Sequence, residues 1–160
     1  MGSGELGRLA PGAPFLHWLL TTGEITTPAL ETRCGCRLRS VREVTIDGGR
    51  LVRRHVLMDG LGRAVEVAEV RMGSAPAAWA ALSEPLGPWL VAKGWRLRKV
   101  DIRPLAFRNG VGWNRVFPGA RWCLEVFGRS YGLEAKRGGD VEHLQVVEAW
   151  NPPFVGRFWG

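Results

Sequence analysis

The sequence predicts an α+β domain, in which an antiparallel sheet of about six strands has helical flaps covering a buried ligand pocket. Alternating and β-branched residues fill most of the chain after Leu38, and glycine-rich turn signals separate several of these stretches. Short apolar segments that begin with Pro or end before Gly favour a few helices. Such helices must cover one face of the sheet, which leaves room for a ligand between the two layers.

The chain is expected to begin with helices. Residues 1–14 are rich in Gly and Pro, and we expect a flexible N-terminal segment there, followed by a single domain over 15–160. The pattern predicts a short helix over 14–20. It predicts another over 24–31, with Thr27 as the cap and Pro28 as the first helical residue.

The strands follow, joined by recognisable turns. Asp47-Gly48-Gly49 predicts a hairpin, the segment 59–62 turns the chain again, and the segment 137–140 joins the last two strands. The expected strand segments are 41–46, 51–58, 64–71, 95–105, 121–127, 129–137 and 141–150, with helices over 75–82 and 85–93.

Composition and charge restrict the class of protein. The 160 residues are 46% hydrophobic, which suits one domain with a sizeable core. Because no apolar run approaches the length of a membrane span, we expect a cytoplasmic protein without a membrane partner. The net charge of +7 favours an anionic partner, but the basic residues are scattered and form no DNA-binding motif. A small-molecule substrate is therefore expected rather than nucleic acid, and the oligomeric state is left open.

Neither a metal nor a cofactor is expected. Cys34 and Cys36 form half of a metal site, but no second pair or histidine cluster completes it. The chain also lacks a glycine-rich phosphate loop and a Ser/His/Asp or Cys/His arrangement. Any activity should depend on carboxylates, arginines and the shape of a pocket.

Glu148 is the first candidate for catalysis. It shares a strand face with Leu144, Val146 and Trp150. Burial among such neighbours would raise its pKa towards neutrality and suit it to acid or base chemistry. The alternatives are a glutamate paired with an arginine and a glutamate exposed on the rim of the sheet.

Three further charged residues can each belong to a site or have only a structural role. Glu69 and Arg71 share a strand face with Val65 and Val67, so one of them can point inwards or both can form an ion pair near an edge. Arg129 begins a strand and can clamp a carboxylate, or it is a surface arginine.

Several short segments, taken in order, are similar to those of a known family. They are Leu16 to Leu20 with Glu24 to Thr26, Arg53 to Gly60, Pro85 to Leu90, Arg98 to Ile102, Phe127 to Ser130 and Val146 to Pro152. In their order and spacing the chain resembles chorismate pyruvate-lyase, a cofactor-free enzyme of ubiquinone biosynthesis. Its fold is shared with ligand-sensing domains of some bacterial regulators. The resemblance implies an antiparallel sheet with helical flaps over a buried site.

The resemblance also implies roles for single residues. Glu148 matches the glutamate that contacts the substrate hydroxyl, and Ile25 matches a hydrophobic residue that touches the ligand. Trp89 and Trp95 would help to shape the cavity. Glu69 stands where the family has an arginine for the substrate carboxylate, and the segment ending at Ser130 lacks the second of the family's two arginines. Both changes remove positive charge from the expected site.

These observations lead to three functional hypotheses. The first is a cofactor-free lyase or cyclase acting on a hydrophobic intermediate of specialised metabolism, with Glu148 and Glu69 as the acid and base residues. The second is a genuine chorismate pyruvate-lyase that forms 4-hydroxybenzoate and pyruvate, with Arg71 or Arg129 binding a carboxylate. The third is a non-catalytic small-ligand-binding domain.

Overall fold

The structure is a computed structural model that describes residues 14–34, 37–47, 50–108 and 125–151. Its helices are α1 (Pro14–Thr21), α2 (Thr26–Cys34), α3 (Ala77–Ala80) and α4 (Leu86–Ala92). Its strands are β1 (Arg39–Asp47), β2 (Arg50–Met58), β3 (Ala64–Arg71), β4 (Arg96–Arg108), β5 (Glu125–Arg137) and β6 (Asp140–Trp150). The predicted flexible segment over 1–14 lies almost entirely outside the described residues.

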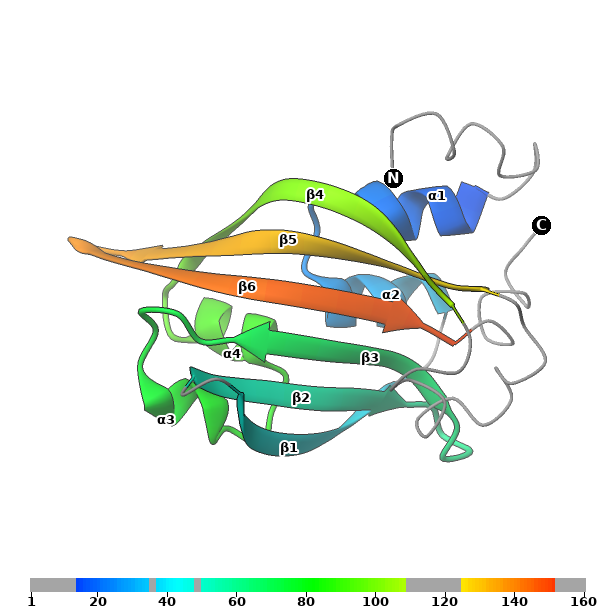
Figure 1. Ribbon diagram of the computed structural model, residues 1–160, viewed down its shortest axis with the longest axis horizontal. Helices are drawn as coiled ribbons and strands as arrows, with labels where there is room; N and C mark the ends of the chain where they lie inside the picture. Colours follow the sequence, from blue (N-terminus) through cyan, green and yellow to red (C-terminus); the bar gives the residue numbers. More distant parts are fainter. Residues whose placement is uncertain (1–13, 35–36, 48–49, 109–124, 152–160) are drawn as a thin grey trace.

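The strands form one antiparallel sheet, which confirms the predicted α+β class. Within the described ranges the sheet has six strands in the order β1-β2-β3-β6-β5-β4 (Figure 1). β3 pairs with β6 in the middle of the sheet, so residues about 80 positions apart in the sequence become neighbours. This long-range pairing joins strands β1 to β3 and strands β4 to β6 into a single sheet.

The turns follow the predicted chemistry where the structure describes them. Asp59 Oδ1 accepts hydrogen bonds from the backbone N–H groups of Leu61 (2.9 Å) and Arg63 (3.0 Å). Gly62 has φ +73°, a conformation that favours glycine. Arg137 pairs with Asp140 at the last hairpin, as predicted. The predicted Gly48-Gly49 turn lies outside the described residues.

Several predicted boundaries were wrong, and three of the differences change an element. The segments 121–127 and 129–137 are not separate strands, because β5 runs unbroken through Gly128, which pairs with Ala149; residues 121–124 lie outside the described ranges. Helix α2 begins at Thr26, since a proline is tolerated in the first turn, where backbone N–H groups have no helical partner. Helix α3 is only four residues long.

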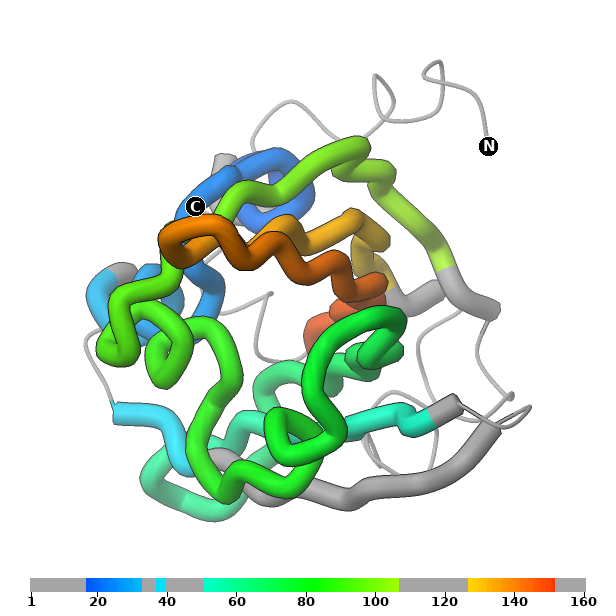
Figure 2. The backbone as a smooth tube through the Cα atoms, turned by 90° about the vertical axis from the view of Figure 1, so that its left-hand side faces the viewer, coloured from blue at the N-terminus to red at the C-terminus, as the bar shows by residue number. Residues whose placement is uncertain are grey.

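The helices pack on the sheet through two apolar clusters. Leu86 and Leu90 of α4 are buried with Val146, Leu133 and other side chains of the central strands. Leucines of α1 and α2 form a second cluster with Leu57, Val65 and Trp150. Figure 2 shows α2 and α4 next to each other, and the two helices are in contact. The site lies between these two helices and the sheet.

Candidate functional site

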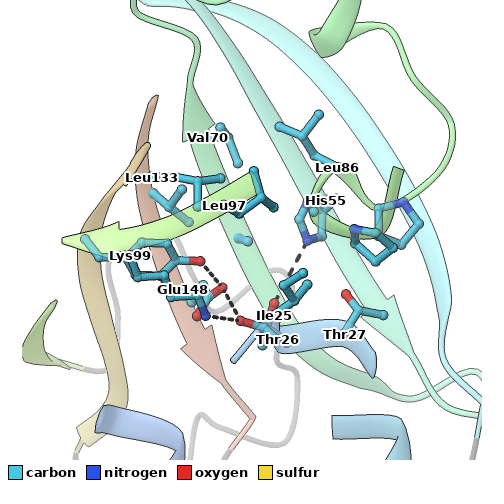
Figure 3. A pocket seen from close by; sticks show the side chains of 17 residues that line it. Ile25, Thr26, Thr27, His55, Val70, Leu86, Leu97, Lys99, Leu133 and Glu148 are labelled. Atoms are coloured by element: carbon cyan, nitrogen blue, oxygen red, sulfur yellow. Dashed lines mark hydrogen bonds and ion pairs between the residues drawn. The ribbon is translucent and has the colours of Figure 1, made fainter. Parts of the chain in front are cut away.

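A small cavity lies between α2, α4 and the sheet (Figure 3). Its volume is about 50 Å³, which is room for a few water molecules. The wall is largely aliphatic and includes Ile25, Val70, Leu86, Leu97, Leu133 and Val146. The polar residues of the wall are Thr26, Thr27, His55, Glu66, Lys99, Tyr131 and Glu148.

The strand register aligns several of these polar groups. His55 on β2 pairs with Ala68 on β3, and Ala68 pairs with Glu148 on β6. Glu148 in turn pairs with Arg129 on β5. Directly paired residues share a face of a sheet, so this row crosses the floor of the cavity. Glu66 lies two residues before Ala68 and therefore on the same face.

Glu148 is held by donors on three sides. Its Oε2 atom accepts a hydrogen bond from Arg129 Nε at 2.9 Å. Its Oε1 atom accepts hydrogen bonds from the hydroxyls of Tyr131 at 2.6 Å and Thr26 at 2.8 Å. Glu148 is 3% exposed and Arg129 is fully buried, so this is a buried ion pair with additional hydrogen bonds.

The same cluster holds the connection between α1 and α2 together with Thr26, the first residue of α2; we call residues 22–26 the α1–α2 connection. Arg129 Nη1 donates to the carbonyl oxygen of Thr22 at 2.6 Å, and Lys99 Nζ donates to that of Glu24 at 2.6 Å. Both cations also donate to Thr26 Oγ1, at 3.3 Å from Arg129 and 3.0 Å from Lys99. The polar centre of the site thereby fixes one of its covering segments.

A β-bulge accompanies the approach of Lys99. Between Val100 and Arg103 strand β4 has two residues opposite one residue of β5. Asp101 in the bulge has φ +53°, which Asp tolerates better than most residues. On the N-terminal side of the bulge, the ammonium group of Lys99 lies 4.7 Å from the centre of the Tyr131 ring.

Glu66 and His55 form a second polar group on the floor. Glu66 is 1% exposed, and its Oε2 atom accepts a hydrogen bond from Trp150 Nε1 at 2.7 Å. Its other oxygen, Oε1, lies 3.9 Å from His55 Nε2, which is too far for a hydrogen bond. Within the described part of the chain, the buried Nδ1 atom of His55 has no hydrogen-bond partner.

The surroundings of Glu148 and Glu66 shift the pKa values of these two carboxyl groups in opposite directions. Burial opposes ionisation of Glu148, but the charges of Arg129 and Lys99 outweigh it and hold the Glu148 pKa below its usual range. Burial, reinforced by the negative charge of Glu148, raises the pKa of Glu66 well above its usual range. The cavity therefore faces one carboxyl group whose ionised form is favoured and one whose protonated form is favoured.

The basic groups are also shifted by burial. Desolvation, with the nearby charge of Arg53, lowers the pKa of His55 to about 4, so its imidazole is neutral at pH 7. Desolvation lowers the pKa of Lys99 to about 8, which still leaves it largely protonated. Burial and the charge of Glu148 raise the pKa of Tyr131, which keeps its hydroxyl a donor.

Arg53 fixes the other covering segment. Its guanidinium is fully buried and donates to the carbonyl oxygens of Trp79 (3.2 Å), Leu82 (2.5 Å) and Glu84. These carbonyls lie at the end of α3 and in the connection to α4. Strand β2 thus anchors the helical segment that leads into the wall of the cavity.

Three of the residues predicted from the sequence lie at this site. Glu148 and Ile25 line the cavity, and Arg129 binds Glu148 directly. The pairing of Glu148 with an arginine was the alternative to a desolvated acid, and it explains why the Glu148 pKa is lowered rather than raised.

The other predicted residues lie elsewhere. Glu69 is half-buried and Arg71 is exposed, and both are on the face of β3 opposite to Glu66 and Ala68. Placing them in the site was wrong because side chains alternate along a strand and the cavity lies on the other face. Trp95 packs edge-on against Trp79 at 5.0 Å, and Trp89 does so at 6.4 Å. These tryptophans support the core under α4 and are not among the cavity-lining residues.

Sequence reasoning missed Glu66, His55, Lys99, Tyr131 and Thr26. A signal existed for Glu66, which is the one charged residue among the alternate positions Ala64, Ala68 and Val70. Nothing in the sequence brings His55, on another strand, to the same place; that depends on the register of β2 with β3.

Comparisons with known proteins do not assign the site. The chain matches no protein-family model and no curated protein sequence. No helix in the described ranges has the length and apolar character needed to cross a membrane. The described residues also contain no group of three or more His, Cys, Asp or Glu side chains that could hold a metal ion. The chemistry of the site must therefore be inferred from its own residues.

Proposed function

We propose that the chain is a cofactor-free small-molecule enzyme of lyase or cyclase type with a fold like that of chorismate pyruvate-lyase. Its substrate would be a hydrophobic intermediate of specialised metabolism, and its reaction a cyclisation or an elimination. The observation that carries this proposal is the pair Glu148 and Glu66, two carboxyl groups with opposite protonation preference facing one apolar cavity. Carboxyl groups whose environments separate their pKa values are typical of acid and base assignments in enzymes.

In this proposal Glu66 is the proton donor and Glu148 is a fixed negative charge. Burial and the charge of Glu148 favour the protonated form of Glu66, which lines the cavity, so it can protonate a leaving group or a carbonyl oxygen. Glu148 is already engaged by three donors, which makes it a poor base. It orients Thr26 and Tyr131 and balances the charge of Arg129.

The character of the wall favours a substrate that is less anionic than chorismate. On the cavity face of β3, Ala68 lies directly opposite Glu148, with Glu66 and Val70 on either side. The two cations near the cavity, Arg129 and Lys99, already bind Glu148, Thr26 and backbone carbonyls. A carboxylate ligand would have to displace these partners, whereas an apolar ligand would not.

Substrate entry requires the covering segments to move. Pockets for small molecules usually measure about 300–1,000 Å³, whereas this cavity measures about 50 Å³. The parts of the wall that are not strands of the sheet are the α1–α2 connection with the start of α2, and α4 with the preceding Pro85. Closure of these segments over a substrate would hold it in a reactive conformer and exclude water, which suits a cyclisation.

The proposal is tested with the metabolites of a source strain that lacks the gene. Extracts are incubated with purified protein and compared by liquid chromatography and mass spectrometry. Cyclisation changes the retention time of a compound at constant mass, and elimination lowers its mass. We expect one compound to be converted by the wild type and by the far-face control Glu69→Gln, but at least about a hundredfold more slowly by Glu66→Gln, the usual scale for loss of a general acid. Equal conversion by Glu66→Gln would exclude Glu66 as the acid, and no conversion by the wild type would contradict the enzyme proposal.

A second candidate is a genuine chorismate pyruvate-lyase, favoured by the two cations near Glu148, the buried Arg129 and the half-buried Lys99. It is tested by incubation with chorismate and measurement of 4-hydroxybenzoate and pyruvate. Activity that is lost in Glu148→Ala and retained in Arg71→Ala would establish this candidate. Arg71 serves as the control because it is exposed on the opposite face of the sheet.

A further inference from the structure

The floor of the cavity contains a pair of polar atoms that do not satisfy each other. Glu66 Oε1 and His55 Nε2 lie 3.9 Å apart, beyond hydrogen-bond distance. Both residues line the cavity and both are at least nine-tenths buried. Two polar atoms at this separation can both bind a single oxygen atom placed about 2.8 Å from each, a normal hydrogen-bond length.

The partners of Glu66 indicate which of its oxygens carries a proton. Trp150 Nε1 is a donor only, so Oε2, which binds it, is an acceptor. Burial and the charge of Glu148 favour the protonated form of Glu66, and its proton then belongs on Oε1, the oxygen facing His55. The carboxyl group therefore presents an O–H donor to the gap.

The environment of His55 supports a second donor. Its imidazole is neutral, so one ring nitrogen carries a proton and the other does not. Nδ1 is buried and has no hydrogen-bond partner among the described residues. Buried N–H groups without partners are rarer than buried acceptors without them. This favours the tautomer with the proton on Nε2, which faces Glu66.

We propose that Glu66 and His55 form a binding site for a carbonyl oxygen, and that the ligand is a neutral, otherwise apolar ketone or enone. Because both residues present donors to the gap, an oxygen bound there acts as an acceptor. A carbonyl oxygen meets this requirement with no proton of its own, whereas a hydroxyl group would need a further acceptor for its proton. The aliphatic side chains of Val70, Leu86 and Val146 in the same wall would contact the remainder of the ligand. Two hydrogen bonds to a carbonyl oxygen stabilise negative charge that develops there, as cyclisation through an enol or an addition step requires.

The test uses two probes of nearly equal shape. Acetophenone has a carbonyl group where α-methylstyrene has a methylene group. For the wild type we expect acetophenone to bind about tenfold more tightly, corresponding to roughly one net hydrogen bond. Acetophenone labelled with ¹³C at the carbonyl should also show a downfield shift of that resonance on binding. Equal affinity for the two probes, no binding of acetophenone, or an unchanged carbonyl resonance would each overturn the proposal.

Variants then assign the donors. Glu66→Leu and His55→Leu should each lose most of the preference for acetophenone while binding α-methylstyrene as before. Glu66→Gln retains an N–H donor and should keep part of the preference, and Glu69→Gln, on the opposite face, should match the wild type. Retention of the full preference in both leucine variants would overturn the assignment. If these variants do not fold, the comparison of probes on the wild type still decides the proposal.

This inference concerns the same cavity as the proposed function, but its test involves no turnover. A protein that prefers the carbonyl probe and converts no metabolite would retain the oxygen site and lose the enzyme proposal. A protein that converts a metabolite but shows no preference for the carbonyl probe would retain the enzyme proposal and lose the oxygen site.

Discussion

At the scale of single residues, the ion pair between Glu148 and Arg129 has the largest energetic consequences. Both side chains are almost completely buried, so each has lost its hydration and depends on the other. A buried ion pair is rarely more stable than an apolar pair of the same size, but removal of one partner leaves an uncompensated charge. The pair is thus better explained by its place in the site than by stability alone.

Removing one partner of the buried ion pair should therefore destabilise the protein more than replacing both partners. Glu148→Leu should lower the free energy of unfolding by about 3–5 kcal/mol, because it leaves the buried guanidinium of Arg129 without its carboxylate. The double variant Glu148→Leu/Arg129→Met should be more stable than Glu148→Leu alone. The measurement is urea denaturation of both proteins. A double variant whose free energy of unfolding falls by the sum of the losses in Glu148→Leu and Arg129→Met would contradict this account.

The matched control is an ion pair at the surface. Glu134 binds Arg98 at 3.3 Å and Lys136 at 3.2 Å, and both basic side chains are at least half exposed. Because water screens such pairs, Glu134→Leu should change the free energy of unfolding far less than Glu148→Leu does.

At the scale of elements, the contact between α4 and the α1–α2 connection closes one side of the cavity. A Cβ atom added to Gly87 would lie 2.9 Å from Ile25 Cγ2, closer than side chains normally approach. Glycine at this position therefore lets the helix come close to Ile25, which lines the cavity.

We predict that Gly87→Ala destabilises the protein by about 1–3 kcal/mol through overpacking. In the background of Ile25→Ala, which removes the crowded methyl group, the same substitution should have a smaller effect. A double-mutant cycle measured by chemical denaturation gives the coupling between the two positions. Independent, additive effects would show that α4 does not rest on Ile25.

The hydroxyl group of Thr26 makes the α1–α2 connection depend on the buried charges. It donates to Glu148 and accepts from Lys99 and Arg129. Thr26→Val keeps the shape of the side chain but removes all three hydrogen bonds. We therefore expect faster amide hydrogen exchange in residues 22–30, because local opening becomes easier.

Thr27→Val is the control for this prediction. Thr27 is the next residue of α2, is equally buried and also lines the cavity. Its substitution should leave the exchange rates of residues 22–30 close to those of the wild type. Similar acceleration in both variants would mean that the effect comes from the helix and not from the charge cluster.

At the scale of the whole molecule, His55 and Glu66 should affect the pH dependence of stability in opposite directions. The folded-state pKa of His55, about 4, is below its usual 6.5, so its stabilisation is present above pH 6.5 and is lost as the pH falls towards 4. The folded-state pKa of Glu66 is raised, so its stabilisation is present below its usual pKa of 4.5 and is lost as the pH rises. Between pH 4.5 and 6.5 the two contributions therefore have opposite slopes.

Replacing either Glu66 or His55 should reveal the effect of the other residue on the pH dependence of stability. In Glu66→Gln, the free energy of unfolding should fall by about 2–3 kcal/mol between pH 6.5 and 4.5, at 1.36 kcal/mol per pKa unit. In His55→Leu, it should rise over the same interval, while the wild type and Glu69→Gln should resemble each other and change by an amount between those of the two variants. Urea denaturation at several pH values measures these slopes. A flat profile for Glu66→Gln would contradict a strongly lowered His55 pKa.

The sequence alone determined the α+β class, the sheet of about six strands and most helix and strand positions. These features depend on local periodicity and on turn residues, such as those around Asp59 and Gly138. Both signals come from residues that are close together in the sequence. It also identified Glu148, Arg129 and Ile25 as site residues. The alternation along β3 grouped Glu69 with Arg71 correctly, but periodicity does not tell which of two mixed faces is covered.

Only the tertiary structure decided which face of the sheet holds the cavity and which groups meet there. Glu66, His55, Lys99 and Tyr131 come from four different strands, and the register between these strands brings them together. The protonation of Glu148 was likewise decided by a partner on another strand, because the same buried carboxyl has a raised pKa when isolated and a lowered one beside Arg129. Burial and charge are properties of the assembled environment, so the chemistry of this site depends on the fold as a whole.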